Sequence, residues 1–111
     1  MDKLDHYRQC IKTILLEFSR VAPANGDIEV QPIFDTERDH YQVVDLGWDK
    51  HQRVYNSVIH FDIKDGKIWI QRNQTEQVLA DILIEMGVPK EDIVLGLQPP
   101  YAREYTGLGT V

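Results

Sequence analysis

Hydrophobic and polar positions alternate through the middle of the chain. Two alternating apolar runs meet at Asp65-Gly66, a pair typical of a two-residue hairpin turn. One further strand-like run, over residues 41–48, precedes the first of these two, which covers residues 53–63, and the polar residues 49–52 join them. An earlier run over 28–34 contains Pro32, which cannot donate to a strand ladder and therefore indicates a sheet edge. The pattern predicts an antiparallel β-meander of about four strands.

Helical spacing of apolar residues precedes this meander. From Leu4 to Val21 they recur every three or four positions, which predicts an N-terminal helix. Pro23 is expected to end that helix, and Asn25-Gly26 to form a turn before the first strand. The only cysteine, Cys10, lies in the apolar stripe, and we interpret it as a small core residue.

A second helix is predicted after the meander. Its apolar stripe covers residues 78–86, Gly87 ends it, and Asn73 or Thr75 is the expected cap, with Glu76 in capping-box spacing. The predicted fold class is α+β: a meander packed on one face by the N-terminal helix and the second helix. A short extended or turn segment follows at the C-terminus.

The hairpin at Asp65-Gly66 fixes which side chains share a face. It places Asp62 opposite Trp69 and His60 opposite Gln71. Carrying the register back to residue 44 gives an apolar core face, made of Val44, Leu46, Ile59, Phe61, Ile63, Ile68 and Ile70. The other, mixed face contains Tyr41, Val43, Asp45, Asn56, Val58, His60, Asp62, Trp69 and Gln71. Because it is too polar for a core and too aromatic for an ordinary wet surface, we interpret it as a contact surface formed by Tyr41, His60, Asp62, Trp69 and Gln71.

Length and charge narrow the classes of function. A chain of 111 residues, 42% hydrophobic and 27% charged, fits a single domain over residues 1–111. No apolar run is long enough to span a bilayer and the N-terminus does not resemble a signal peptide, so we expect a cytoplasmic protein. The net charge of −6 argues against direct binding of nucleic acid and favours a protein partner.

Residue patterns that suggest catalysis or metal binding all have simpler interpretations. Asp62-Ile63-Lys64 with Asp35 superficially matches a metal-dependent nuclease, but Lys64 flanks a turn and is expected to be solvated. The four histidines lack ligand spacing and two fall in predicted loops, so neither a metal site nor a cofactor is predicted. Ser57 is placed on the core face, which leaves no nucleophile for a triad.

A helix-turn-helix is a further alternative over residues 76–93. Its second segment is short and carries Glu91 and Asp92 where phosphate contacts would need basic residues. We therefore favour the interpretation as a single core helix followed by a turn.

Three ordered strings suggest a family: G-W-D-K-H-Q-R-V over 47–54, V-I-H-F-D-I-K-D-G-K-I-W-I-Q-R-N-Q-T-E over 58–76, and G-V-P-K-E-D-I-V-L-G-L-Q-P-P-Y-A-R-E-Y-T over 87–106. In these strings the sequence resembles the XisI family, described as controlling factors for excision of the fdxN element in cyanobacteria. The resemblance covers nearly the whole chain and places these residues on motif positions of unknown role: Trp48, Arg53, His60, Trp69, Gln71, Thr75, Glu76 and Arg103. The ending over 106–111 departs from the family pattern.

The resemblance implies a regulatory role in DNA rearrangement in heterocyst-forming cells, with a XisH-like partner and a site-specific recombinase. Many members occur with XisH-like proteins apart from any excised element. We therefore expect a non-enzymatic accessory protein whose mixed face binds a XisH-like partner or a second copy of the chain. The alternative is a small enzyme or direct DNA-binding protein with a polar site at His60, Asp62 and Gln71.

Overall fold

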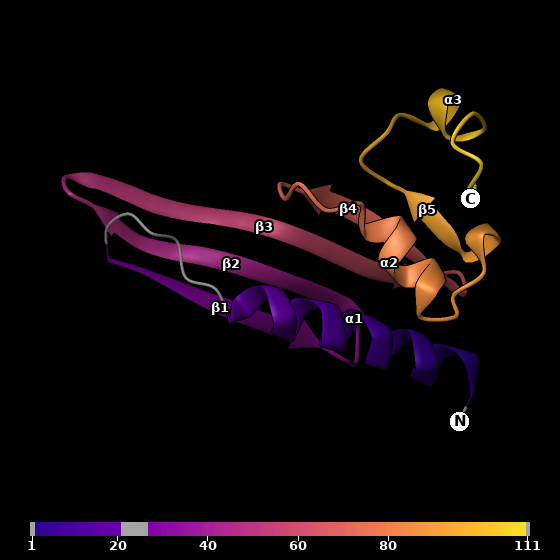
Figure 1. Ribbon diagram of the computed structural model, residues 1–111, viewed down its shortest axis with the longest axis horizontal. Helices are drawn as coiled ribbons and strands as arrows, with labels where there is room; N and C mark the ends of the chain where they lie inside the picture. The colour runs from indigo at the N-terminus through magenta and orange to yellow at the C-terminus, as the bar shows by residue number, and fades with distance from the viewer. Residues whose placement is uncertain (1, 21–26, 111) are drawn as a thin grey trace.

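A computed structural model describes residues 2–20 and 27–110, arranged as one five-stranded sheet with helices against it (Figure 1). In chain order the elements are α1 (Lys3–Ser19), β1 (Asp27–Asp35), β2 (His40–Asp49), β3 (Gln52–Lys64), β4 (Lys67–Asn73), α2 (Leu79–Glu85), the 3₁₀ turn η1 (Lys90–Asp92), β5 (Ile93–Leu95) and α3 (Pro100–Arg103). The strand order is β1-β2-β3-β4-β5. The predicted α+β fold and its four-stranded meander are confirmed; β5 adds a fifth strand, parallel to β4.

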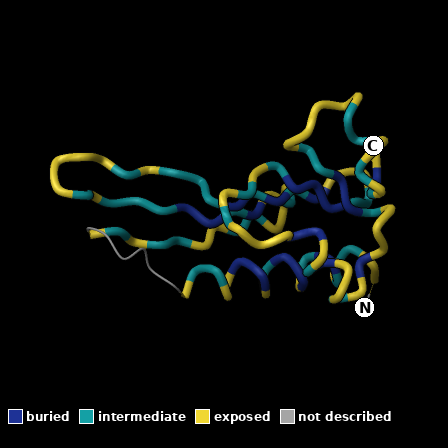
Figure 2. The backbone as a smooth tube through the Cα atoms, turned by 45° about the horizontal axis from the view of Figure 1, so that its top comes forward, coloured by how far each residue is buried: buried dark blue, intermediate teal, exposed yellow. Residues whose placement is uncertain are grey.

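The core lies between the sheet and the two longer helices. α1 covers β1 and β2, α2 packs on β4, and buried side chains from both helices join those of the strands in one cluster. Figure 2 shows the buried positions concentrated where the helices pack on the sheet, whereas the β2–β3 hairpin extends beyond the helices with intermediate and exposed positions. Within the described residues, no helix is long and apolar enough to cross a membrane.

The N-terminal helix is attached to the sheet by its predicted apolar stripe and by polar contacts. Asp2 caps it by accepting a hydrogen bond from the backbone of Asp5, 2.8 Å away. Cys10 is buried as predicted, and burial raises the pKa of its thiol. The predicted helix stop at Pro23 and the turn at Asn25-Gly26 lie outside the described residues.

Acid is expected to weaken the attachment of α1 to η1. Tyr7 donates a hydrogen bond to Asp92, and Lys3 lies 3.0 Å from the same carboxylate. Burial acts to raise the pKa of Asp92, but the hydrogen bonds from Tyr7 and Lys3 outweigh it and leave this pKa below its usual value. An unfolded Asp has a pKa of about 3.9, which is higher than the pKa of Asp92 in the folded protein. In acid the unfolded chain therefore binds more protons than the folded chain. The stabilisation is therefore complete above that pH and lost as the pH falls through the folded pKa.

Urea unfolding measured from about pH 6 down to about pH 3 checks this expectation. The Asp92→Asn variant should be less stable at the upper end and lose less stability toward the lower end. Equal acid dependence in the variant and the wild type would show that Asp92 does not contribute.

A bulge between β2 and β3 changes the predicted faces. Val43 pairs with Ile59, but Val44 pairs with Ser57, so Val58 is an extra residue on β3. The predicted pairing of Val44 with Ser57 is confirmed, but the predicted core assignment is wrong on β2. Because one extra residue reverses the alternation, Tyr41 and Val43 belong to the core, and Val44, Leu46 and Ser57 lie on the opposite face.

A second bulge interrupts the β3–β4 hairpin. The turn at Asp65-Gly66 forms as predicted, with positive φ at both residues, and Asp62 pairs with Trp69. Beyond Phe61 the register shifts, so His60 pairs with Arg72 and not with Gln71. Gln71 becomes the extra residue, and its side chain still reaches Asp62.

The start of the second helix also differs from the prediction. α2 begins at Leu79, and Val78 occupies its N-cap position with no side-chain cap. Asn73 and Thr75 instead form a separate turn, in which the backbone of Thr75 donates to Asn73 Oδ1 at 2.9 Å. The predicted end is confirmed, because Gly87 follows the helix at a φ of 96°.

Candidate functional site

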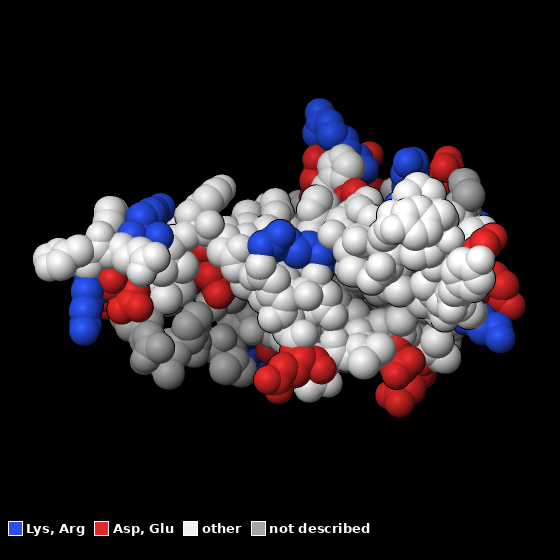
Figure 3. Space-filling model, turned by 90° about the horizontal axis from the view of Figure 1, so that it is seen from above, with Lys and Arg blue, Asp and Glu red and all other residues white. Residues whose placement is uncertain are grey.

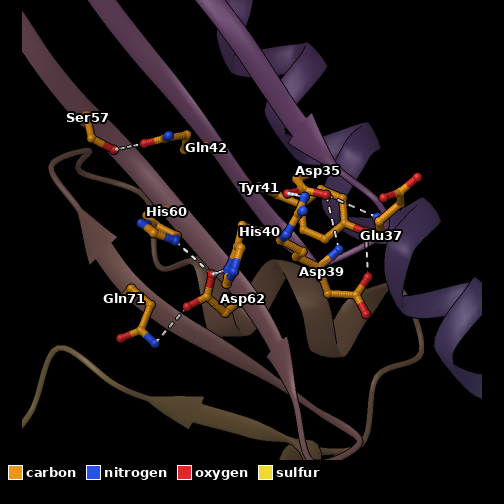
Figure 4. A network of polar contacts seen from close by, with 11 residues as sticks. Asp35, Glu37, Asp39, His40, Tyr41, Gln42, Ser57, His60, Asp62 and Gln71 are labelled. Atoms are coloured by element: carbon orange, nitrogen blue, oxygen red, sulfur yellow. Dashed lines mark hydrogen bonds and ion pairs between the residues drawn. The ribbon is translucent and has the colours of Figure 1, made fainter.

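A polar cluster of four side chains, His40, His60, Asp62 and Gln71, occupies the face of the sheet opposite the core, which we call the outer face (Figure 4). His60 and Asp62 are two residues apart on β3 and therefore point to the same side. His40, the first residue of β2, pairs directly with Asp62. The register of β2 and β3 thus brings the two imidazoles to one carboxylate.

Asp62 is the centre of this cluster. Its Oδ1 lies 2.7 Å from His40 Nδ1 and 2.7 Å from His60 Nε2, while Gln71 Nε2 donates to Oδ2 at 3.1 Å. The two imidazole rings are nearly perpendicular, with centroids 6.5 Å apart. The carboxylate is 18% exposed, against 33% for His60 and 56% for His40. The cluster therefore opens to solvent on the histidine side.

The hydrogen bonds hold Asp62 in its ionised form. Burial acts to raise the pKa of this carboxyl group, but hydrogen bonds from His40, His60 and Gln71 outweigh that effect. The pKa of Asp62 therefore lies below its usual value. An ionised carboxylate beside two imidazole nitrogens can serve as an ion pair, as a proton acceptor or as a metal ligand.

Two residues of the predicted contact surface are buried. Tyr41 is fully buried in the core, because the β2–β3 bulge turns it inward, and its hydroxyl donates to Asp39 at 2.8 Å. Trp69 does lie on the outer face but is only 6% exposed. The structure thus brings together His60, Asp62 and Gln71 from the predicted surface, and separates Tyr41 from them.

The C-terminal segment, residues 93–110, explains the burial of Trp69. The Arg103 guanidinium lies 5.1 Å from the centre of the indole ring, and the Lys64 ammonium lies 4.8 Å from it. Gly96 approaches so closely that a Cβ there would lie 3.1 Å from the ring. The segment predicted to be a short extended or turn region therefore packs against the sheet.

His40 is the member of the cluster that the sequence did not reveal. The apolar pattern predicts a strand from residue 41 onward, with His40 in the preceding loop. Strand β2 begins one residue earlier, at His40. The confirmed turn at Asp65-Gly66 fixes the pairing of β3 with β4 but not the pairing of β2 with β3. The pairing of His40 with Asp62 follows only when the bulge at Val58 is counted.

The nuclease-like arrangement considered from the sequence does not form. Asp35 accepts hydrogen bonds from the backbones of Glu37 and Arg38, so it stabilises the β1–β2 turn and not the site of Asp62 (Figure 4). Lys64 lies over Trp69. In the view of Figure 3, Lys and Arg side chains occupy separate places among acidic ones and form no continuous basic surface on that face.

Comparison with known proteins identifies the family. A model of the family described as XisI protein matches residues 1–110. The chain belongs to the XisI family. A XisI-like protein from Anabaena variabilis ATCC 29413 is 49% identical and superimposes with a TM-score of 0.92, covering 99% of this chain and 100% of that chain. The comparison with curated proteins gives no match.

A second solved structure is more distant. It is the fdxN element excision controlling factor XisI from Anabaena variabilis ATCC 29413, which is 32% identical with a TM-score of 0.88, over 99% of this chain and 100% of that chain. The five-stranded fold described above is therefore shared by relatives that differ from this chain at half or more of their positions.

The motif positions outside the polar cluster and Trp69 differ in their surroundings. Arg103 and Thr75 have structural contacts, with Arg103 donating to the Leu95 and Gln98 carbonyls at 3.3 and 3.1 Å. Trp48 and Arg53 instead lie together near the exposed end of the β2–β3 hairpin, with the guanidinium 5.5 Å from the ring centre. Glu76 is exposed on the turn before α2.

Proposed function

We propose that this chain is a non-enzymatic accessory protein that controls excision of a DNA element by binding a XisH-like partner, which in turn acts with a site-specific recombinase. The observation that carries the proposal is the exposed outer face of the β2–β3 hairpin, here called the hairpin surface. It comprises Leu46, Trp48, Arg53 and Tyr55. The name of the related excision controlling factor supports the role in excision control.

The hairpin surface has the composition of a protein-binding site. Trp48 is 52% exposed and Tyr55 is 73% exposed, and Leu46 pairs directly with Tyr55 across the two strands. Trp, Tyr and Arg are the residue types that contribute most of the binding energy at protein interfaces. The hairpin extends beyond the helices, so a partner can reach this surface without displacing them (Figures 1 and 2).

The neighbouring polar residues support association over catalysis. The Ser57 hydroxyl donates to Gln42 at 3.0 Å, and this pair lies apart from the two histidines in Figure 4. A serine nucleophile requires a base within hydrogen-bond reach, and here its hydrogen bond goes to an amide oxygen. The net charge of −6 further favours a protein partner over direct contact with DNA phosphates.

Replacing Tyr55 by arginine tests the proposal. The Tyr55→Arg variant should fold normally because the side chain is exposed, and should bind the XisH-like protein about 30-fold or more weakly, the loss expected at an interface hot spot. Co-expression followed by light scattering of the purified complex, and calorimetric titration of the two proteins, measure the effect.

Leu16→Arg is the matched control. Leu16 is 45% exposed on α1, on the side of the sheet away from the hairpin surface, so this variant should retain full affinity. Equal affinity of Tyr55→Arg and wild type for the partner would exclude the hairpin surface. Light scattering of the isolated wild-type chain and of Tyr55→Arg separately reports whether a second copy occupies the same surface.

A further inference from the structure

We propose that His40, His60 and Asp62 bind one divalent transition metal ion per chain, with Zn²⁺ as the first candidate. The proposal concerns the polar cluster alone and does not depend on the partner or on the hairpin surface. It is drawn from the position, spacing and chemistry of three side chains on two neighbouring strands.

The three donors suit such an ion. Two imidazoles and one carboxylate are nitrogen and oxygen ligands that Zn²⁺ accepts, and the same set occurs in open sites of other divalent transition metals. A carboxylate coordinates a cation in its deprotonated form. His40 offers Nδ1 and His60 offers Nε2, both directed at the same carboxylate oxygen (Figure 4).

The spacing of the donors is close to that of a coordination shell. One ligand atom from each residue can be chosen so that all three lie within 4.8 Å of one another. Zn–N and Zn–O distances of about 2.0–2.2 Å in tetrahedral geometry place ligand atoms roughly 3.4 Å apart. Both imidazoles hydrogen-bond to Asp62 Oδ1 at 2.7 Å. Small rotations of the side chains therefore exchange the hydrogen bonds for metal bonds.

The fold holds the donors in place. Strands β2 and β3 are both interior strands of the sheet, so hydrogen bonds on both sides fix the backbone of all three residues. Gln71 donates to Asp62 Oδ2, the oxygen that does not contact the imidazoles. Such a partner behind a ligating carboxylate orients it toward the ion.

Three protein ligands leave one position of a tetrahedral ion open. His40 is the most exposed of the three, so the open position faces solvent on the outer face. Structural zinc sites use four protein ligands, whereas sites with three retain a water or an incoming ligand. The site we infer therefore takes a water molecule, or an oxygen or nitrogen donor from another molecule, as its fourth ligand.

Titration of the untagged, chelator-treated protein with Zn²⁺ in competition with a chromophoric chelator tests the proposal. We expect one equivalent to bind, and His40→Ala, His60→Ala and Asp62→Asn each to weaken binding about 100-fold or more. Gln71→Ala should weaken it about 10-fold, as expected for a residue that positions a ligand. Circular dichroism confirms that each variant is folded.

Two controls separate this site from the other donors in the chain. His51→Ala removes an exposed histidine from the β2–β3 turn and should leave Zn²⁺ affinity unchanged. Cys10→Ala tests the thiol, whose sulfur lies 3.7 Å from His6 Nε2, and should also leave affinity unchanged.

X-ray absorption of the Zn²⁺ complex of the wild-type protein is independent of any variant. It should show nitrogen and oxygen ligands at about 2.0–2.2 Å and no sulfur. The proposal is overturned if the wild type binds Zn²⁺ no more tightly than His60→Ala, if His51→Ala weakens binding as much as His60→Ala does, or if sulfur appears in the coordination shell.

Discussion

Replacing Trp69 by alanine is expected to lower the free energy of unfolding by about 3–5 kcal/mol, the range for deletion of a buried aromatic side chain. The indole is 6% exposed, its ring lies against Lys64 and Arg103, and its Nε1 donates to the Lys64 carbonyl at 3.3 Å. The alanine variant loses all of these contacts at once. Urea unfolding followed by far-UV circular dichroism measures the change without depending on tryptophan fluorescence.

The same substitution should also release the C-terminal segment from the outer face. Arg103 would lose its contact with the ring, and only its hydrogen bonds to backbone carbonyls such as that of Gln98 would remain. We therefore expect hydrogen exchange in residues 96–106 to accelerate relative to the wild type, and to accelerate more than exchange in β2 and β3.

Trp48→Ala is the matched control, since Trp48 and Trp69 are the only tryptophans of the chain. Trp48 is 52% exposed, and the Arg53 guanidinium lies 5.5 Å from the centre of its ring. An exposed cation–π contact contributes about 0.5–1 kcal/mol, so this variant should lose much less stability than Trp69→Ala. If the two alanine variants had equal stability, the packing of the C-terminal segment on Trp69 would be wrong.

Local sequence signals were sufficient for much of the fold. The helical stripe around Tyr7, Ile11 and Leu15, the turn at Asp65-Gly66 and the helix end at Gly87 each depend on neighbouring residues, and each is found in the structure. Pro32 correctly marked β1 as an edge strand. These features follow from periodicity and backbone preference, which act over a few residues.

Features that depend on pairing between distant segments were not predictable in this way. A bulge adds one residue to one strand, and no residue type in the stretch around Val58 predicts a bulge there. That extra residue reversed the faces of β2, which moved Tyr41 into the core. The parallel pairing of β5 with β4 likewise depends on the connection through α2.

The candidate site was predicted in part for the same reason. His60 and Asp62 share a face through simple alternation on one strand, and Gln71 comes close through the adjoining hairpin. His40 is 22 residues away from Asp62 along the chain and reaches it only through the correct β2–β3 register. The third metal donor therefore became visible only with the structure.

The reversal of faces at Tyr41 has a consequence for stability. Tyr41→Ala should lower the free energy of unfolding by about 3–5 kcal/mol, because the ring is fully buried among core residues such as Phe61. Tyr41→Phe keeps the ring and removes only the hydrogen bond to Asp39, so it should cost about 1.5–3 kcal/mol, the range for a hydrogen bond to a charged group. Urea unfolding of both variants at neutral pH gives the two values.

Tyr55→Ala provides the comparison, because it removes the same side chain from the neighbouring strand, where it is 73% exposed. It should change stability by no more than about 0.5 kcal/mol. On a regular β2–β3 ladder without the extra residue, Tyr41 would lie on the outer face, and its loss would resemble that of Tyr55. A much larger loss of stability in Tyr41→Ala than in Tyr55→Ala would therefore confirm that the bulge at Val58 turns Tyr41 toward the core. Equal and small losses would show that the register is regular.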